Sequence, residues 1–200
     1  MTSADEKRPW RGAEWAGAGN IGGTLGRRFA AAGLDVVYGT RQGGGEGPGG
    51  APSAPVAEAL AGAGAVVLAI PGPAVPEFAA QYGADLDGKV VVDATNHIGA
   101  AEVNSRSAIE AAAPGAHYAR AFHTLGWENF ADPPAGGCMF YAADEPARPV
   151  VDELISAVGL EPALVGGADA AGIVDGALPL WFALVRQQGG SRKLAFRLVR

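Results

Sequence analysis

Short apolar runs alternate along the chain with alanine-rich segments whose apolar positions recur at helical spacing. The runs are the predicted strands, and three of them are apolar through most of their length, as expected of parallel strands covered on both faces. They span residues 34–39, 63–70, 89–94 and 118–123. The predicted helices between them span residues 21–32, 57–61, 75–82 and 105–113. This alternation of strand and helix predicts βαβ units and a doubly wound parallel sheet, an α/β fold.

The pattern changes after residue 138. Residues 138–143 predict a further strand, and residues 145–158 predict an amphipathic helix that ends at Gly159. One segment of low complexity lies earlier, at residues 42–53, where six Gly and two Pro make a helix unfavourable.

The end of the chain is predicted to be helical. Residues 178–185 begin a strongly apolar helix, and a glycine pair separates it from a last short helix over residues 192–199. We therefore expect three parts: an irregular segment at 1–16 with a weak first strand, a nucleotide-binding domain at 17–165, and a small helical C-terminal part at 166–200 that completes the substrate side.

Residues 17–22 have the form G-x-G-x-x-G and open the first predicted helix. Gly17 permits a tight turn, Gly19 lets the backbone approach a pyrophosphate, and Gly22 lets helix and strand pack closely. The N–H groups and dipole at the start of a helix favour bound phosphate. Because the chain contains 31 Gly, the motif is weak alone, but the strand after the helix supports it. The combination predicts a Rossmann-type dinucleotide-binding domain.

The segment before this motif fits less well. A central strand should be apolar, yet Arg11 and Glu14 fall where that strand is expected. Burying unpaired charges there would cost several kcal/mol. Either the first strand is short and poorly paired, or the first fifteen or so residues are not the native start of the domain.

The tip of the second predicted strand indicates which dinucleotide is preferred. NAD-dependent enzymes carry a carboxylate there for the ribose hydroxyls. This chain has Gly39, Thr40 and Arg41 instead. A guanidinium and a hydroxyl can donate to a 2′-phosphate, so NADP(H) is favoured over NAD(H). The alternative is that Arg41 is a solvated loop residue.

Composition narrows the function classes. Of 200 residues, 48% are hydrophobic and 18% charged, enough to bury a core, and the net charge of −6 argues against binding nucleic acid or an anionic membrane. The single Cys and three scattered His disfavour a disulfide framework and a metal site. No stretch reaches the roughly 18 uninterrupted apolar residues of a membrane span. The polar N-terminus lacks a signal-peptide core, so we expect a cytoplasmic protein.

Six short motifs occur in an order typical of a known family. They lie at residues 17–22, 39–41, 69–71, 93–96, 121–124 and 194–198. With them, the chain resembles the NADPH-dependent reductases of the deazaflavin coenzyme F-420, a family that includes many dinucleotide-binding enzymes assigned from sequence. The resemblance covers nearly the whole chain after residue 16.

The resemblance implies where the ligands lie. The cofactor would contact Gly17, Ala18, Gly19, Asn20, Ile21, Gly22, Thr40, Arg41, Ile70, Pro71, Gly72, Pro76 and Asn96. The deazaflavin would contact His123, Trp127 and, in the last helix, Leu194. The family usually carries a second basic residue four positions after the Arg, where this chain has Gly45, so the phosphate clamp looks weakened. The resemblance also implies a homodimer.

Other polar and aromatic residues have two interpretations each. His97 and His123 follow strands and could donate to a carboxamide or ring carbonyl, although such residues more often cap a strand end. Asp93 could be a base or a structural acceptor. Cys138 fits a small buried residue, and Trp181 with the following Phe fits core or dimer packing better than a cofactor site.

No convincing acid–base pair is visible, so no catalytic residue is assigned. Lys7, Lys89 and Lys193 are the only lysines, and none has a Tyr at suitable spacing. Hydride transfer between nicotinamide and deazaflavin needs stacked rings and no side-chain nucleophile. We therefore expect an NADP-dependent oxidoreductase acting on coenzyme F-420. The alternatives are a reductase of another flavin or a metal chelate, and a non-catalytic NADP-binding protein.

Overall fold

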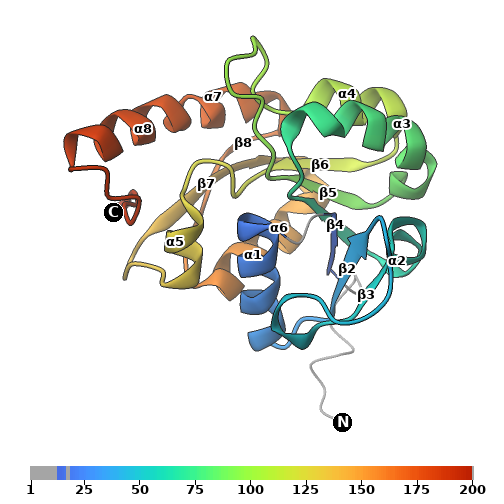
Figure 1. The fold of residues 1–200 in the computed structure, drawn as a ribbon. Helices are drawn as coiled ribbons and strands as arrows, with labels where there is room; N and C mark the ends of the chain where they lie inside the picture. Colours follow the sequence, from blue (N-terminus) through green and yellow to red (C-terminus); the bar gives the residue numbers. More distant parts are fainter. Residues whose placement is uncertain (1–12, 17–18, 200) are drawn as a thin grey trace.

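The computed structural model describes residues 13–16 and 19–199, and these form one eight-stranded sheet with helices on both faces (Figure 1). The strand order is β3-β2-β1-β4-β5-β6-β7-β8. The strands are β1 (Ala13–Ala16), β2 (Val36–Thr40), β3 (Ser53–Pro55), β4 (Ala65–Leu68), β5 (Val90–Asp93), β6 (His117–Arg120), β7 (Cys138–Ala143) and β8 (Glu161–Gly166). The order of the first six strands is that of a doubly wound dinucleotide-binding sheet, which confirms the predicted fold class.

Strands β1 to β6 are parallel, and β7 turns back antiparallel to β6 before β8 pairs parallel to β7. The first strand has four residues, yet it pairs along its whole length with β2 on one side and β4 on the other. The chain therefore reverses its direction of winding between β1 and β4, which is where open sheets of this kind bind their ligands.

Apolar residues of alternating strand positions pack into two layers. Val67 and Val92 face a cluster with α1 and α6, whereas Val66 and Val91 face a cluster with α2, α3 and α4. Burial on both faces explains why these strands are continuous apolar runs in the sequence. The helices are α1 (Asn20–Ala31), α2 (Val56–Gly62), α3 (Val75–Leu86), α4 (Arg106–Ala112), α5 (Trp127–Ala131), α6 (Arg148–Val158), α7 (Ala171–Asp175) and α8 (Ala177–Gln187).

Helix α6 shows how local sequence sets an end. It follows a short 3₁₀ turn at Glu145–Ala147 and stops at Gly159, whose φ of 96° lies in the left-handed region. Glycine adopts this conformation without steric cost, so the helix ends where the sequence predicts.

The last predicted helix, over residues 192–199, is wrong. That segment is irregular and not helical, and Phe196 forms an isolated bridge with Cys138, the first residue of β7. Hydrogen bonds to other elements replace helical ones: Cys138 N–H donates to the Phe196 carbonyl at 2.8 Å, and the Trp181 indole Nε1 donates to the Leu194 carbonyl at 2.7 Å. The sequence analysis also missed β3, β8 and α5.

One helical stretch, Ala168–Gln187, is long and apolar enough by composition to cross a membrane, and 44% of its apolar window is buried within the fold. It contains Asp175, which is paired with Arg120 in the interior, and Trp181, which lies in the main core cluster. We therefore interpret it as part of the fold, with α7 packed against β6, β7 and β8 and α8 continuing beyond it (Figure 1).

Candidate functional site

The candidate site lies along the carboxyl ends of the parallel strands. The predicted contacts Asn20, Arg41, Gly72, Asn96 and Trp127 follow β1, β2, β4, β5 and β6 respectively. Because the carboxyl ends of parallel strands meet at one edge of the sheet, the fold brings these five segments to the same side. Gly17 and Ala18 lie outside the described residues.

The glycine turn after β1 leaves room for a ligand. Gly19 is the N-cap residue of α1, and no side chain caps the first N–H groups of that helix. A Cβ built at Gly19 meets no atom of the described residues within 4 Å, its chain neighbours aside. Asn20 is exposed at the helix start, while Ile21 and Gly22 turn inward. An uncapped helix start facing open space fits a bound pyrophosphate.

The sequence predicts close helix–strand packing at Gly22, and the structure shows such packing between α1 and β2 at Gly26. A Cβ at Gly26 would overlap the ring and hydroxyl of Tyr38 on β2. Tyr38 is fully buried, and burial raises the pKa of its phenol. The absence of a side chain at Gly26 therefore lets α1 lie against β2.

The tip of β2 is open where a 2′-phosphate would bind. Thr40 Oγ1 accepts the Gly43 N–H at 3.0 Å and lies 3.3 Å from the Ser53 hydroxyl. These contacts fix the Thr40 side chain within the turn. Arg41 is exposed, and no contact to another described side chain is seen for its guanidinium. Arg41 is therefore available to an anionic group that approaches the edge of the sheet.

The loops after β4 and β5 pack tightly on each other. A Cβ at Gly72 would lie 2.6 Å from the Asn96 carbonyl oxygen and 2.9 Å from His97 Cδ2. Only glycine fits there, so Gly72 brings the two loops together. Ile70 is partly buried before Gly72, whereas Pro71 and Pro76 are exposed around the short 3₁₀ turn at Gly72–Ala74.

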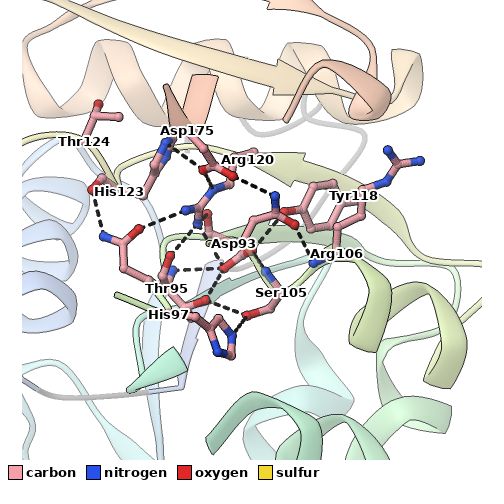
Figure 2. A network of polar contacts seen from close by, with 12 residues as sticks. Asp93, Thr95, His97, Ser105, Arg106, Tyr118, Arg120, His123, Thr124 and Asp175 are labelled. Carbon is pink, nitrogen blue, oxygen red and sulfur yellow. Dashed lines mark hydrogen bonds and ion pairs between the residues drawn. The ribbon is translucent and has the colours of Figure 1, made fainter. Parts of the chain in front are cut away.

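Beneath these loops lies a buried polar cluster centred on Asp93, the last residue of β5 (Figure 2). Asp93 Oδ1 accepts the N–H and hydroxyl of Thr95 at 2.9 and 2.6 Å, and Oδ2 accepts the Ser105 N–H and the Tyr118 hydroxyl at 2.7 and 2.9 Å. Burial and the Asp93 charge raise the pKa of Tyr118 well above its usual value, so Tyr118 is a permanent donor. The buried Asp93 carboxylate thus has protein hydrogen-bond donors on both oxygens, which favours the structural interpretation over that of a base.

Arg120, the last residue of β6, is the counterion of the cluster. It is fully buried and donates from Nε to Asp175 Oδ1 at 2.8 Å, while its Nη1 lies 3.4 Å from Asp93 Oδ1. Nη1 also donates to the carbonyls of Asp93 and Thr95 at 3.1 and 2.5 Å. One buried guanidinium therefore joins β5, β6 and the end of α7.

Asn96 is oriented by the same cluster. Its Oδ1 accepts from Arg120 Nη2 at 2.9 Å, and its Nδ2 donates to the His123 carbonyl at 2.9 Å. Asn96 remains partly exposed, so it keeps one N–H for a ligand near the nicotinamide position. Arg120 sets the direction in which that N–H points.

His123 has a position different from the one expected of a direct contact. Its side chain is buried, with Nε2 3.3 Å from Asp175 Oδ1 (Figure 2). Burial and the nearby Arg120 lower the pKa of His123 well below its usual value, so the ring is neutral. Its role as a substrate contact stays a prediction, because in this structure only its carbonyl supports the site, through Asn96.

Before His123, Phe122 has a left-handed backbone, with φ of 62°. This conformation is rare for a bulky residue and costs about 1–3 kcal/mol. The Phe122 ring is buried edge-on against Phe29 and Phe130, with ring centres 6.1 and 5.8 Å away. The aromatic packing holds the strained turn that follows β6.

Trp127 and Leu194 lie on segments that are bound together. Trp127 begins α5 and is 37% exposed, and Leu194 is partly buried on the extended C-terminal segment. Asn129 Nδ2 donates to the Arg192 carbonyl at 2.8 Å, and Arg192 Nε lies 3.0 Å from Glu128 Oε1. The predicted helix around Leu194 is absent, but the segment still reaches α5. The roles of both residues stay predictions.

Sequence reasoning missed Arg120, Asp175 and Ser105. An Arg within an otherwise apolar strand was the one available signal for Arg120, because a buried guanidinium needs a buried anion. Asp175 and Ser105 carry no local signal. Among the described residues, no group of three or more His, Cys, Asp or Glu could hold a metal ion.

The comparisons with known proteins agree with this geometry. Residues 16–97 match the family described as NADP oxidoreductase coenzyme F420-dependent, which confirms the resemblance seen in the sequence and indicates an NAD(P)-dependent oxidoreductase. The matched segment runs from the end of β1 through the glycine turn and the Thr40–Arg41 tip to Asn96. No curated protein matches the chain.

Solved structures share the fold. A candidate F420-dependent NADP reductase from Arthrobacter sp. FB24 has a TM-score of 0.79 at 21% identity, covering 96% of this chain and 100% of that one. A hypothetical protein from Sinorhizobium meliloti has a TM-score of 0.68 at 28% identity, covering 81% and 87%. A pyrroline-5-carboxylate reductase from Coxiella burnetii has a TM-score of 0.65 at 15% identity, covering 88% and 67%.

Proposed function

We propose that the protein binds NADPH along the carboxyl edge of the sheet and transfers a hydride reversibly between it and the deazaflavin coenzyme F-420. The observation that carries the proposal is the family match over residues 16–97, because that segment contains the open Gly19 turn, the exposed Arg41 and the Asn96 loop. NADP(H) supplies the hydride chemistry when bound, and the chain supplies binding and orientation.

Each part of the site has a role in this proposal. The uncapped start of α1 binds the pyrophosphate, and Thr40 with Arg41 binds the 2′-phosphate. Gly72 keeps the Asn96 loop close, so that the free N–H of Asn96 meets the nicotinamide side of the cofactor. Trp127 forms a wall for the second ring, because it is the exposed aromatic residue at the end of the β6 segment.

The electrostatics of the site support an anionic ligand at one end only. Arg41 is the exposed cation at the tip of β2, and Gly45 at the family's second basic position adds no charge. The Asp93–Arg120–Asp175 cluster carries a formal charge of −1 beneath the other end. A phosphate is therefore drawn to β2, and the uncharged nicotinamide lies nearer β5.

The test uses the purified full chain with NADPH and coenzyme F-420. We expect the deazaflavin absorbance to be lost on reduction, and to return when NADP⁺ is added to reduced coenzyme. Turnover with FMN or FAD but not with coenzyme F-420 would support a flavin reductase, and turnover with a ferric chelate alone would support a metal-chelate reductase. NADPH binding without turnover would support a non-catalytic NADP-binding protein.

The proposal includes a homodimer and a cytoplasmic location. Ile173 and Leu180 are 71% and 52% exposed on α7 and α8, apolar surface that a second subunit would cover. Light scattering at two concentrations tests this, and a mass of one chain at both would remove the dimer from the proposal.

A further inference from the structure

A continuous chain of hydrogen bonds connects the partly exposed His97 to the buried Asp93 (Figure 2). Asp93 Oδ1 lies 2.6 Å from Thr95 Oγ1, which lies 2.7 Å from Ser105 Oγ, which lies 2.9 Å from His97 Nε2. The mechanism proposed above uses none of these side chains directly.

The direction of each hydrogen bond in the chain follows from its buried end. The Thr95 hydroxyl donates to Asp93 Oδ1, which also accepts the Thr95 N–H. Thr95 has then used its one proton, so the Ser105 hydroxyl donates to Thr95. Ser105 has used its proton as well, so His97 Nε2–H must donate to Ser105.

This direction fixes the state of the His97 ring. Neutral His97 carries its proton on Nε2, which leaves a lone pair on Nδ1. Imidazolium keeps the same Nε2–H bond and adds a proton on Nδ1. Among the described residues, Nδ1 has no hydrogen-bond partner. The atom can therefore gain or lose a proton without breaking the chain.

His97 also lies at the reacting end of the candidate site. It follows Asn96 directly, and its Cδ2 is the side-chain atom closest to the space above Gly72. Asn96 and Gly72 are the residues assigned to the nicotinamide side of the cofactor. His97 thus lies among the loops where a hydride acceptor would meet the nicotinamide.

We propose that His97 exchanges the proton that accompanies hydride transfer, with Asp93, Thr95 and Ser105 holding its ring through the Nε2–H bond. This inference rests on the proposed function, since it assigns a proton route to the same site. It extends the acceptors to any conjugated ring that takes a hydride on a ring carbon or nitrogen and a proton on another ring nitrogen.

In the proposed reaction, NADPH loses a hydride from its nicotinamide carbon and becomes NADP⁺, and the acceptor ring gains that hydride with both electrons. The acceptor ring is left with one negative charge on a nitrogen, which takes the proton from His97 Nδ1. His97 becomes neutral, keeps Nε2–H on Ser105, and regains a proton from solvent because the ring is partly exposed. The reverse reaction runs through the same groups.

The far end of the hydrogen-bond chain is a charged cluster. Asp93 is bonded to His97 through the two hydroxyls, and Arg120 lies 3.4 Å from Asp93 Oδ1. The Tyr118 hydroxyl also donates to Asp93, at 2.9 Å from Oδ2.

The experiment compares His97→Ala, His97→Gln and Ser105→Ala with wild type, and uses His117→Gln as a matched control. His117 is also partly exposed on a strand, but at the amino end of β6, away from the site. Single-turnover reduction of coenzyme F-420, and of FMN in parallel, is measured with NADPH across a range of pH. NADPH affinity is measured separately by calorimetry.

We expect both His97 variants to slow reduction about a hundredfold at neutral pH with unchanged NADPH affinity, because proton transfer by a positioned side chain contributes on that order. Added imidazole should partly restore His97→Ala and leave His97→Gln unchanged. Ser105→Ala should keep the histidine but release its ring, since the Nε2–H bond is lost, so reduction should slow less than in the His97 variants. His117→Gln should match wild type.

A spectroscopic measurement tests the ring state independently of the acceptor. In ¹⁵N-histidine-labelled protein, neutral His97 should show the Nε2–H form, and Ser105→Ala should remove that preference. The Nδ1–H form in wild type, or an active wild type whose rate and pH profile survive in His97→Gln, would overturn the role of His97 alone. A wild type that binds NADPH but reduces neither acceptor would overturn the proposed function and this role with it.

Discussion

Arg120 and Asp175 are bound to each other in the interior although 55 residues separate them in the chain. Arg120 Nε lies 2.8 Å from Asp175 Oδ1, with the two side chains 0% and 8% exposed. The pair joins the sheet that presents the candidate cofactor site to the C-terminal helices. Asp175 also accepts from Asn104 Nδ2 at 2.7 Å, so it fixes the loop after Asn96 as well.

Asp175→Asn should therefore destabilise the fold strongly. Removing one partner leaves the buried Arg120 charge incompletely compensated, and such changes typically cost about 3–5 kcal/mol. The control is Glu110→Gln, which breaks the exposed Arg106–Glu110 pair on α4 and should cost less than about 1 kcal/mol. Denaturant unfolding measures both. Equal losses in the two variants would contradict the importance of the buried pair.

His123 should make the fold less stable in acid. Because its pKa is lowered in the folded state, the unfolded chain takes up a proton first as pH falls below the ordinary value of 6.5. The free energy of unfolding should then fall with decreasing pH, by at most about 1.4 kcal/mol per unit for this group. Above pH 6.5 this contribution is complete and constant.

The measurement compares the free energy of unfolding of wild type and His123→Asn at about one pH unit above and about one pH unit below the ordinary histidine pKa. The amide does not titrate, so the variant should lose less stability on acidification. Parallel stability curves for the two proteins would show that His123 is protonated equally in the folded and unfolded states.

Much of the fold follows from local sequence. The apolar runs at β4 and β5 predict buried parallel strands because both of their faces are covered, and Gly159 predicts the end of α6 because its φ is positive. The last segment shows the opposite case. Its apolar spacing favours a helix, but Phe196 and Leu194 accept hydrogen bonds from β7 and Trp181, which lie elsewhere in the chain.

The candidate site likewise has parts that local sequence predicts and parts that it does not. The glycine turn and the Thr40–Arg41 tip are contiguous motifs, so the sequence predicts them. The polar cluster joins Asp93, Arg120 and Asp175 from three elements, and no spacing rule relates them. The sequence therefore predicts no acid–base group, while the structure connects His97 to Asp93 through two hydroxyls from different segments.

Gly19→Val should abolish NADPH binding and leave the fold intact. Apart from its chain neighbours, no atom of the described residues lies within 4 Å of a Cβ built on Gly19, so we expect the side chain to occupy the position of the pyrophosphate. The matched control is Gly26→Ala, whose Cβ would overlap Tyr38 and should destabilise the fold by about 1–3 kcal/mol. Calorimetry with NADPH that gives wild-type affinity for Gly19→Val would remove the assignment of this turn.

Trp127→Ala should weaken the use of coenzyme F-420 more than the binding of NADPH. The exposed indole at the start of α5 would lie against the second ring, and aromatic contacts of this kind contribute about 0.5–1.5 kcal/mol beyond burial. KM for the deazaflavin should rise several-fold, and Trp127→Phe should recover most of the loss. If NADPH affinity falls instead, Trp127 belongs to the cofactor half of the site.

Arg41→Ala should lower the preference for NADPH over NADH. A charge-assisted contact to the 2′-phosphate is worth about 1.5–3 kcal/mol, so NADPH should bind about ten- to a hundredfold more weakly. NADH has no such phosphate, and its weaker binding should hardly change. Because Gly45 supplies no second cation and Thr40 is engaged with Gly43 and Ser53, Arg41 should carry most of the discrimination.

The ratio of kcat/KM for NADPH and NADH measures this effect directly. Arg41→Lys should fall between wild type and Arg41→Ala, since an ammonium keeps the charge but loses the paired donors of the guanidinium. Arg186→Ala removes another exposed cation, on α8, and should leave the ratio unchanged. If Arg41→Ala also leaves it unchanged, Arg41 is a solvated loop residue and the 2′-phosphate is bound elsewhere. A rise in activity with NADH would instead indicate that Arg41 excludes that cofactor.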